Sequence, residues 1–107
     1  MRRLVRLTDD FLVLLDTQLP AERTDAAPSR RDFEVRDLLR IVDTFAESWD
    51  WLAPSYRGRT EYREWSGASD LGLAIWVQGQ LAPDGAIELI GLELDIAPPW
   101  VGEPDDD

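Results

Sequence analysis

The sequence predicts a small α+β domain, in the order β-α-α-β-β-β, with two helices packed on one face of an antiparallel sheet. Three observations support this class. Apolar residues recur with the period of a helix across residues 38–52. Two runs that alternate apolar and polar residues follow, at residues 71–81 and 86–96. The segment between these runs, Ala82-Pro83-Asp84-Gly85, has the composition of a tight turn, so the two runs are expected to form a hairpin.

The first strand and the first helix are expected before residue 20. The alternation of residues 2–7 indicates a short strand. Thr8-Asp9-Asp10 supplies a helix N-cap followed by acidic residues, which complement the helix dipole, and apolar residues at helical spacing follow until Pro20. Because the apolar run at residues 11–15 is only five residues long, a strand there remains an alternative. The unpatterned residues 21–28 predict a loop.

The strongest local signal is a long amphipathic helix that begins at Ser29. Ser29 and Asp32 resemble a capping box, in which two side chains satisfy backbone N–H groups at the start of a helix. The apolar residues that follow at helical spacing are Leu38, Ile41, Val42, Phe45, Trp49 and Leu52. Their span predicts about six turns, ended by Pro54. Trp49 is expected in the core and Trp51 at its rim.

The second half of the chain predicts three antiparallel strands, of which residues 60–65 form the first. Successive side chains of a strand point to opposite faces, so Tyr62 and Arg63 are expected on opposite sides of the sheet. A turn follows at residues 67–70. The strand 71–81 has one apolar face, and its other face is expected to carry Trp76, Gln78 and Gln80.

The last strand, residues 86–96, changes phase partway along its length. Ile87 and Leu89 alternate in one phase, whereas the apolar residues from Leu92 onward alternate in the other. One inserted residue inverts every side chain beyond it, so we expect a β-bulge at residues 89–91. The strand also carries acidic residues, at Glu88, Glu93 and Asp95.

The charge distribution is the most informative feature for function. All eleven arginines lie within residues 2–63 beside twelve acidic residues, whereas residues 64–107 carry ten acidic residues and no basic one, which gives the net charge of −11. This balance argues against a phosphate backbone as the partner of the second segment and favours a basic protein surface. We therefore expect a partner-binding surface formed by Trp76, Gln78, Gln80, Glu88, Glu93 and Asp95.

Blander interpretations of this surface remain open. The acidic residues can simply keep the protein soluble. Trp76 can pack against Trp65 or Trp100 instead of a partner.

A second group, at Arg57, Arg59, Tyr62 and Arg63, interleaves aromatic rings with guanidinium groups and could contact nucleic acid or an acidic partner. Its alternative is local pairing with neighbouring acids such as Glu61 and Glu64.

The sequence favours binding over catalysis. Histidine and cysteine are absent, which removes the commonest general base, thiol chemistry and cysteine-ligated zinc. Carboxylate pairs such as Glu93 with Asp95 invite an acid–base or metal role, but they lack a convergent motif, and the serines have no base to activate them. We therefore expect no catalytic residue, no cofactor and no metal site.

Four features together resemble the RelE/ParE toxin superfamily of bacterial toxin–antitoxin systems. They are the β-α-α-β-β-β order, the opening RRLVRLT, the helix pair separated by a polar loop, and the closing hairpin GLAIWVQGQLAPDGAIELIGLELDI. The resemblance covers residues 2–96 and implies a toxin that acts on ribosome-bound mRNA or on gyrase and is neutralised by an antitoxin. RNA-cleaving members use a basic cleft, which only Arg57, Arg59, Tyr62 and Arg63 could match here. The last strand departs from that family pattern, because it ends in acidic residues.

The expected protein is a single domain at residues 1–97 with an acidic, proline-containing tail at residues 98–107. No apolar run is long enough for a secretory or membrane segment, so a cytoplasmic location without a membrane partner is expected. The favoured function is non-catalytic binding of a basic protein through the open sheet face and the acidic last hairpin. The RelE/ParE-type toxin is the alternative, and a homodimer is compatible with either function.

Overall fold

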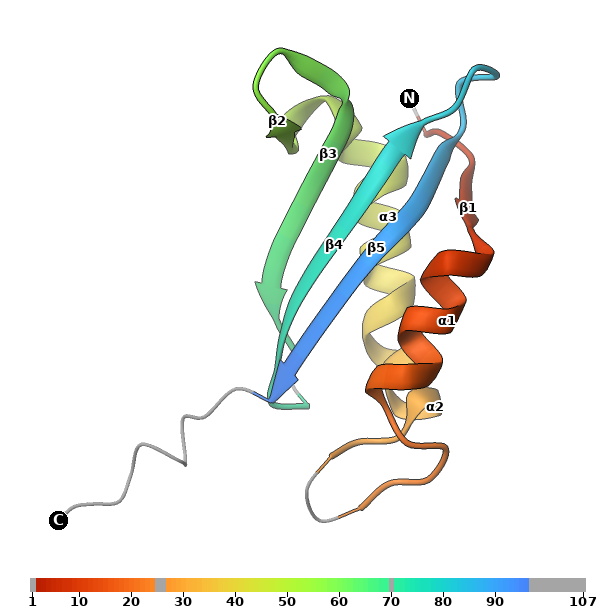
Figure 1. The fold of residues 1–107 in the computed structure, drawn as a ribbon, viewed down its shortest axis with the longest axis vertical. Coiled ribbons are helices and arrows are strands. Elements are labelled where there is room, and N and C mark those ends of the chain that lie inside the picture. Colours follow the sequence, from red (N-terminus) through yellow and green to blue (C-terminus); the bar gives the residue numbers. More distant parts are fainter. Residues whose placement is uncertain (1, 25–26, 70, 97–107) are drawn as a thin grey trace, which may run out of the picture.

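The computed structural model describes residues 2–24, 27–69 and 71–96, so the predicted tail and Trp100 lie outside the described residues. The described chain forms a five-stranded sheet in the order β1-β5-β4-β3-β2 (Figure 1). The strands are β1 (Val5–Leu7), β2 (Ala53–Tyr56), β3 (Arg59–Ala68), β4 (Leu73–Leu81) and β5 (Ile87–Ile96). The helical segments are α1 (Asp9–Gln18), α2 (Arg30–Phe33), a π-helical segment (Glu34–Leu38), α3 (Leu39–Ser48) and a 3₁₀ turn (Trp49–Trp51).

The α+β class and the packing of the helices against the sheet are confirmed, with two differences in the sheet. It is mixed rather than wholly antiparallel, because β1 pairs parallel with β5. Those two strands are joined by nearly the whole chain, so no hairpin dictates their direction. The second difference is the extra strand β2, which contains Pro54 and pairs only with β3. Proline is tolerated there because β2 is an edge strand.

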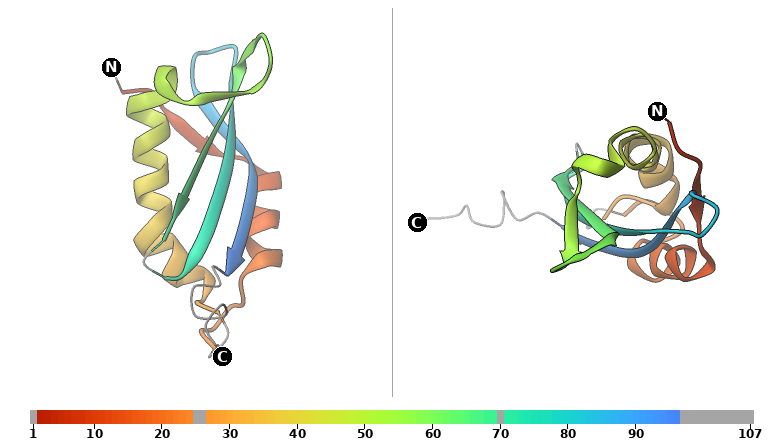
Figure 2. Two further views of the ribbon diagram at one scale, coloured as in Figure 1. Left: turned by 90° about the vertical axis from the view of Figure 1, so that its left-hand side faces the viewer. Right: turned by 90° about the horizontal axis from the view of Figure 1, so that it is seen from above.

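The helix after β1 begins at its predicted cap. Thr8 Oγ1 accepts a hydrogen bond from the Phe11 N–H at 3.2 Å and donates to the Leu89 carbonyl at 2.7 Å. Residues 9–18 are therefore a helix and not the alternative strand. The bond to Leu89 also connects the start of α1 to β5. Figure 2 shows α1 lying beside the lower half of β5, beyond the short β1 strand.

The C-terminal end of α1 completes the edge of the sheet with a side chain. Gln18 Nε2 donates to the Leu92 carbonyl and Gln18 Oε1 accepts from the Leu94 N–H, both at 2.7 Å. A neighbouring strand would make this same pair of bonds. One amide side chain therefore provides the hydrogen-bond partners of β5 beyond the end of β1. Backbone groups of β5 that would otherwise be unpaired at the sheet edge are thereby bonded.

The predicted capping box is present, but the long helix is not uniform. Ser29 Oγ accepts from the Asp32 N–H at 3.0 Å, and Asp32 Oδ2 accepts from the Ser29 N–H at 2.9 Å. A π-helical segment then interrupts the expected α-helix at Glu34–Leu38. Asp37 lies within this segment and is buried, and its Oδ1 accepts a hydrogen bond from Arg40 at 3.2 Å.

The capping box makes a prediction about pH. The bidentate Arg23 guanidinium and the Ser29 N–H hold the pKa of the Asp32 carboxyl far below its usual range. A lowered folded-state pKa means that the carboxylate stabilises the fold above the ordinary aspartate value of about 3.9, and that this contribution is lost as pH falls toward the lowered value. Asp32→Asn should therefore lower stability at pH 7, and its deficit relative to wild type should shrink below about pH 4.

Urea unfolding at pH 7, 5 and 3.5 measures this deficit. Asp16→Asn is the matched control, because Asp16 also pairs with an arginine, Arg30 at 2.8 Å, but within the described residues it caps no helix N-terminus. We expect a small deficit for the control at every pH. An Asp32→Asn deficit that stays constant from pH 7 to pH 3.5 would contradict the assignment.

The core lies between the helices and one face of the sheet. The helical side contributes Phe11, Leu15, Phe33, Ile41, Phe45 and Trp49, and the sheet contributes Leu73, Ile75, Val77, Ile87, Leu89 and Leu92. Trp49 is in the core as predicted, whereas Trp51 is 88% exposed rather than at a rim. The register of β4 with β5 steps from Gln78↔Gly91 to Gly79↔Leu89, which leaves Ile90 unmatched and confirms the predicted bulge.

Candidate protein-binding face

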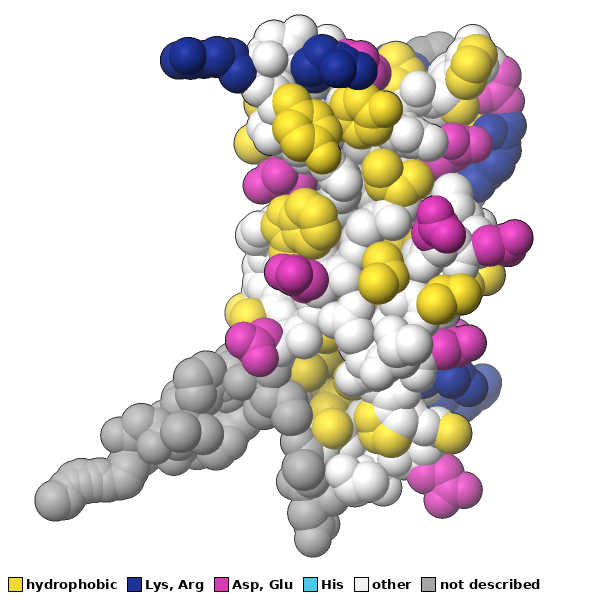
Figure 3. Space-filling view, viewed as in Figure 1, with side chains coloured by type: hydrophobic (Ala, Val, Ile, Leu, Met, Phe, Trp, Pro, Cys, Tyr) yellow, Lys and Arg dark blue, Asp and Glu magenta, His cyan; other side chains and the backbone are white. Residues whose placement is uncertain are grey.

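The helices leave the other face of the sheet uncovered, and we call it the open face. Its side chains form rows across the strands because the antiparallel partners lie opposite one another. Reading from β3 to β4 to β5, these rows are Tyr62–Gln80–Glu88, Glu64–Gln78–Gly91, Ser66–Trp76–Glu93 and Ala68–Ala74–Asp95. In Figure 3, hydrophobic and acidic side chains alternate over these strands, while basic side chains lie at the margins of the view.

Trp76 occupies the middle of the open face. Strand alternation puts it opposite the buried Ile75 and Val77, as predicted from the sequence. Its ring leans across β5 over Gly91, because a Cβ atom at Gly91 would lie 3.1 Å from Trp76 Cζ3 and 3.3 Å from Cη2. The absence of a side chain at Gly91 therefore leaves room for the indole to pack against the β5 backbone.

The ring of Trp65 is not available to cover Trp76. Trp65 packs against the core cluster on the helical face, and the Arg40 guanidinium lies 5.5 Å from its ring centroid. Gly67 leaves room for that ring, since a Cβ atom there would lie 2.5 Å from Trp65 Cζ2. Trp76 thus remains half-buried, with one side of its indole toward solvent.

A hollow of about 280 Å³ lies beside Trp76. It is lined by Ser66, Gly67, Ala74, Ile75, Trp76, Glu93 and Asp95. Its lining therefore combines small residues with the two exposed carboxylates of Glu93 and Asp95. Within the described part of the chain, Glu64, Glu93 and Asp95 form no ion pair, so this end of the open face carries uncompensated negative charge.

At the other end of the open face, the carboxylates have partners within the chain itself. Arg6 on β1 pairs with Asp84 and, at 3.4 Å, with Glu88, while Gln80 Nε2 donates to Glu88 at 2.8 Å. The hydrogen bond from Arg6 holds the pKa of the Asp84 carboxyl below its usual range. Of the predicted partner-binding residues, Trp76, Gln78, Glu93 and Asp95 therefore lie together, whereas Gln80 and Glu88 belong to an internal network.

The predicted basic group is divided between the two faces. Arg59 lies 5.3 Å from the Tyr62 ring centroid and its Nε donates to Glu61 at 2.7 Å, so it is already paired. Arg57 is exposed in the turn between β2 and β3. The Tyr62 ring also meets Tyr56 edge-on at 5.5 Å.

Arg63 points to the helical face, opposite Tyr62, and has a structural task. Its Nη1 donates to the Asp50 and Leu52 carbonyls, both at 3.0 Å, and its Nε donates to the Thr60 carbonyl at 3.0 Å. The guanidinium also lies 5.6 Å from the Trp49 ring centroid. Arg63 thereby ties the C-terminal end of the long helix to β3. Strand alternation in the sequence predicts the sheet face on which Arg63 lies, but it does not predict the hydrogen-bond partners of Arg63.

Comparison with family models, with curated proteins and with solved structures finds no match. The site must therefore be interpreted from its own chemistry. In residues 2–24, 27–69 and 71–96, no group of three or more acidic, histidine or cysteine side chains is placed to hold a metal ion. None of the helices in those ranges has the length and apolar character that a membrane crossing requires.

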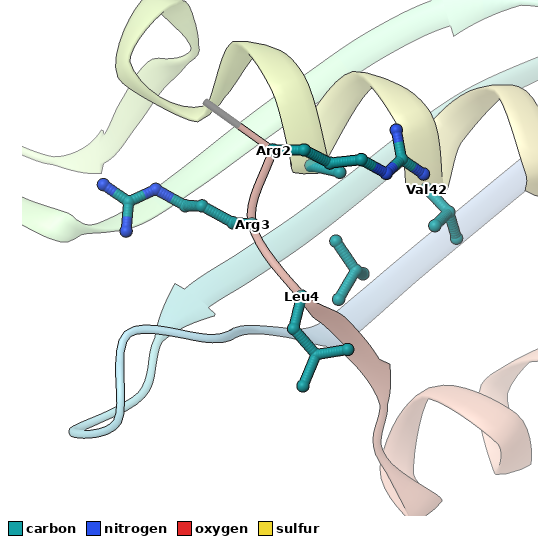
Figure 4. A pocket seen from close by; sticks show the side chains of 6 residues that line it. Arg2, Arg3, Leu4 and Val42 are labelled. Carbon is teal, nitrogen blue, oxygen red and sulfur yellow. The ribbon is translucent and has the colours of Figure 1, made fainter.

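A second hollow, of about 370 Å³, lies between β1 and α3 (Figure 4). It is lined by Arg2, Arg3, Leu4, Val5, Val42 and Ala46. Its two guanidinium groups are engaged by the chain: Arg2 pairs with Asp43 and Glu47, each at 2.7 Å, and Arg3 donates to the Gly85 carbonyl at 3.3 Å. The charge of Arg2 is therefore paired within the chain, whereas Arg3 has only a backbone carbonyl as its partner.

Proposed function

We propose that this chain is a small, non-catalytic protein-binding domain whose open face holds a partner with a basic surface. The observation that carries the proposal is the half-exposed indole of Trp76 beside Glu93 and Asp95, which have no cationic partner in the described chain. Tryptophan is among the residues most enriched at the energetic centres of protein interfaces. Unpaired carboxylates around it favour cationic partners and repel acidic ones.

The charge pattern also argues for a foreign partner over a second copy on this face. A symmetric dimer through the open face would bring Glu64, Glu93 and Asp95 of both chains together. Like charges at close range are unfavourable, most strongly at low ionic strength. A partner bound mainly by opposite charge should dissociate more readily as salt is raised.

The experiment is partner capture with matched variants. Immobilised wild-type protein is compared with Trp76→Ala, with Glu93→Arg, and with Glu47→Arg, an equal charge reversal at an exposed position of α3. We expect the two open-face variants to weaken binding of the captured partner at least tenfold, the control to bind like wild type, and binding to weaken between 50 and 300 mM salt. Equal binding by all four proteins would contradict the proposal.

The RelE/ParE-type toxin remains the second candidate, and one feature favours it. Tyr56, Arg59 and Tyr62 are grouped at one end of the sheet, as a basic aromatic cleft requires. Their charge is limited, because Arg59 is paired with Glu61. Expression from a tightly repressed promoter separates the candidates: growth arrest relieved by Arg59→Ala supports the toxin, and unimpaired growth at high expression excludes it.

A further inference from the structure

We propose that the hollow beside Trp76 is a subsite for one arginine side chain of the partner. This inference rests on the proposed function and assigns its central contact. The hollow measures about 280 Å³. Small-molecule pockets measure about 300–1,000 Å³, so this hollow lies at the small end of that range and matches a small occupant such as one side chain.

The position of the indole leaves room for a flat group. Trp76 leans toward Gly91, whereas the hollow extends the other way along β4, toward Ala74 and the row that ends at Asp95. Small side chains on that side, Ser66 and Ala74, keep the space next to the ring open. A planar cation can therefore lie against the indole without displacing a large side chain.

The two carboxylates that line the hollow are placed to complete the contact. Glu93 is directly opposite Trp76 in the sheet, a relation that separates Cβ atoms by about 4.5–5.5 Å, and Asp95 is one row further. A cation within about 6 Å of the ring centroid is attracted by the indole. The rigid fork of a guanidinium can also donate to carboxylate oxygens while it stacks, which the compact ammonium of lysine does less well.

The protein uses this same arrangement internally. Arg40, Arg59 and Arg63 lie over Trp65, Tyr62 and Trp49 with separations from guanidinium carbon to ring centroid of 5.3–5.6 Å. Each of those guanidinium groups also donates to a carboxylate or carbonyl oxygen nearby. Trp76 with Glu93 and Asp95 supplies the ring and the acceptors, and an arginine from outside would supply the remaining part.

The test is a titration of the ¹⁵N-labelled chain with N-acetyl-arginine amide, compared with the neutral citrulline analogue and with the lysine analogue. We expect the arginine probe to shift the indole N–H signal of Trp76 and the backbone signals of Ser66, Ala74 and Asp95. Citrulline should shift none of them, and lysine should bind at least threefold more weakly than arginine.

Variants test each part of the subsite. Asp95→Asn and Glu93→Gln should each weaken arginine binding about threefold, and Trp76→Leu at least fivefold. Gly91→Val alters no charge, but its side chain would occupy the space in which the Trp76 ring packs, so it should also weaken binding. Glu47→Gln on α3 is the control and should bind the probe like wild type.

The outcomes separate this inference from the proposed function. If arginine and citrulline shift the same signals equally, or arginine shifts none while a partner is still captured through Trp76, the subsite is wrong and the binding function stands. If arginine binds as expected but the open-face variants capture the partner as well as wild type does, the proposed function is wrong. If these signals shift with protein concentration when no probe is added, the hollow binds a second copy of the chain, and the inference is overturned.

Discussion

Phe45→Ala is expected to lower the free energy of unfolding by about 3–5 kcal/mol, the usual cost of removing a buried phenylalanine. Phe45 is fully buried and joins α3 to the sheet, and its ring lies 6.1 Å from that of Trp49, centroid to centroid. Domains of this size are stable by only about 5–15 kcal/mol in total, so the loss is a large fraction. Urea unfolding followed by circular dichroism measures it.

The contact between Phe45 and Gly79 makes the prediction more specific. A Cβ atom at Gly79 would lie 2.9 Å from Phe45 Cε1, so Gly79→Val should overpack the core and cost about 1–3 kcal/mol by itself. The backbone of Gly79 does not have a positive φ, so valine introduces no backbone strain there. In the double variant the valine occupies part of the space that the ring vacates.

We therefore expect the double variant to be more stable than the sum of the two single losses predicts, by about 0.5–3 kcal/mol. Ile41→Val is a suitable reference, because Ile41 is also fully buried in α3 but loses only one methyl group, at a cost of about 0.5–1.5 kcal/mol. Strict additivity of Phe45→Ala and Gly79→Val would mean that the two positions do not touch as described.

Arg63→Met is expected to be the second large effect, with a loss of about 2–4 kcal/mol. The variant keeps an apolar stem against Trp49 but leaves the Asp50 and Leu52 carbonyls without the guanidinium that they share. Hydrogen bonds to a charged group contribute about 1.5–3 kcal/mol each, so these two would contribute about 3–6 kcal/mol if they were fully buried. Arg63 is only half-buried and its bond to Asp50 is exposed, so the expected loss lies at and below the low end of that range.

Arg59→Met on the same strand is the matched control. Arg59 is exposed and pairs with the half-exposed Glu61, so its loss should be below about 1 kcal/mol. Chemical denaturation of both variants gives the comparison. Equal and small losses would contradict the role of Arg63 in tying the helix end to β3, and would return Arg63 to the surface group predicted from the sequence.

Local signals in the sequence predicted much of this fold. The Thr8 cap and the Ser29–Asp32 capping box involve residues at most three positions apart, so sequence alone is enough to specify them. The strand alternation placed Trp76 opposite the core, and the phase change located the bulge at Ile90. In each case the information lies within a few neighbouring residues.

Features that depend on distant partners could not be predicted in this way. Gln18 bonds to Leu92 and Leu94, more than seventy residues away, and β1 pairs with β5 across a similar separation. The π-helical segment overlaps the apolar repeat only at its first residue, Leu38, so the periodicity of the repeat carries no signal of it. Pro54 was expected to end the long helix, whereas the helical segments end at Trp51 and Pro54 lies in an edge strand.

The candidate site shows the same division. Alternation was sufficient to collect Trp76, Gln78 and Gln80 on one face. It could not show that Arg6, from the other end of the chain, pairs with Glu88, because that pair spans 82 positions. The resulting contrast between a paired end and an unpaired end of the open face comes from tertiary structure alone.

The central claim is that the open face contacts the partner, and hydrogen exchange of the protein with and without its captured partner tests it most directly. We predict that protection on binding concentrates in β3, β4 and β5 around Ser66, Trp76 and Glu93, with little change in α1 and α3. Protection confined to the helices, with exchange of β3 to β5 unchanged, would contradict the account.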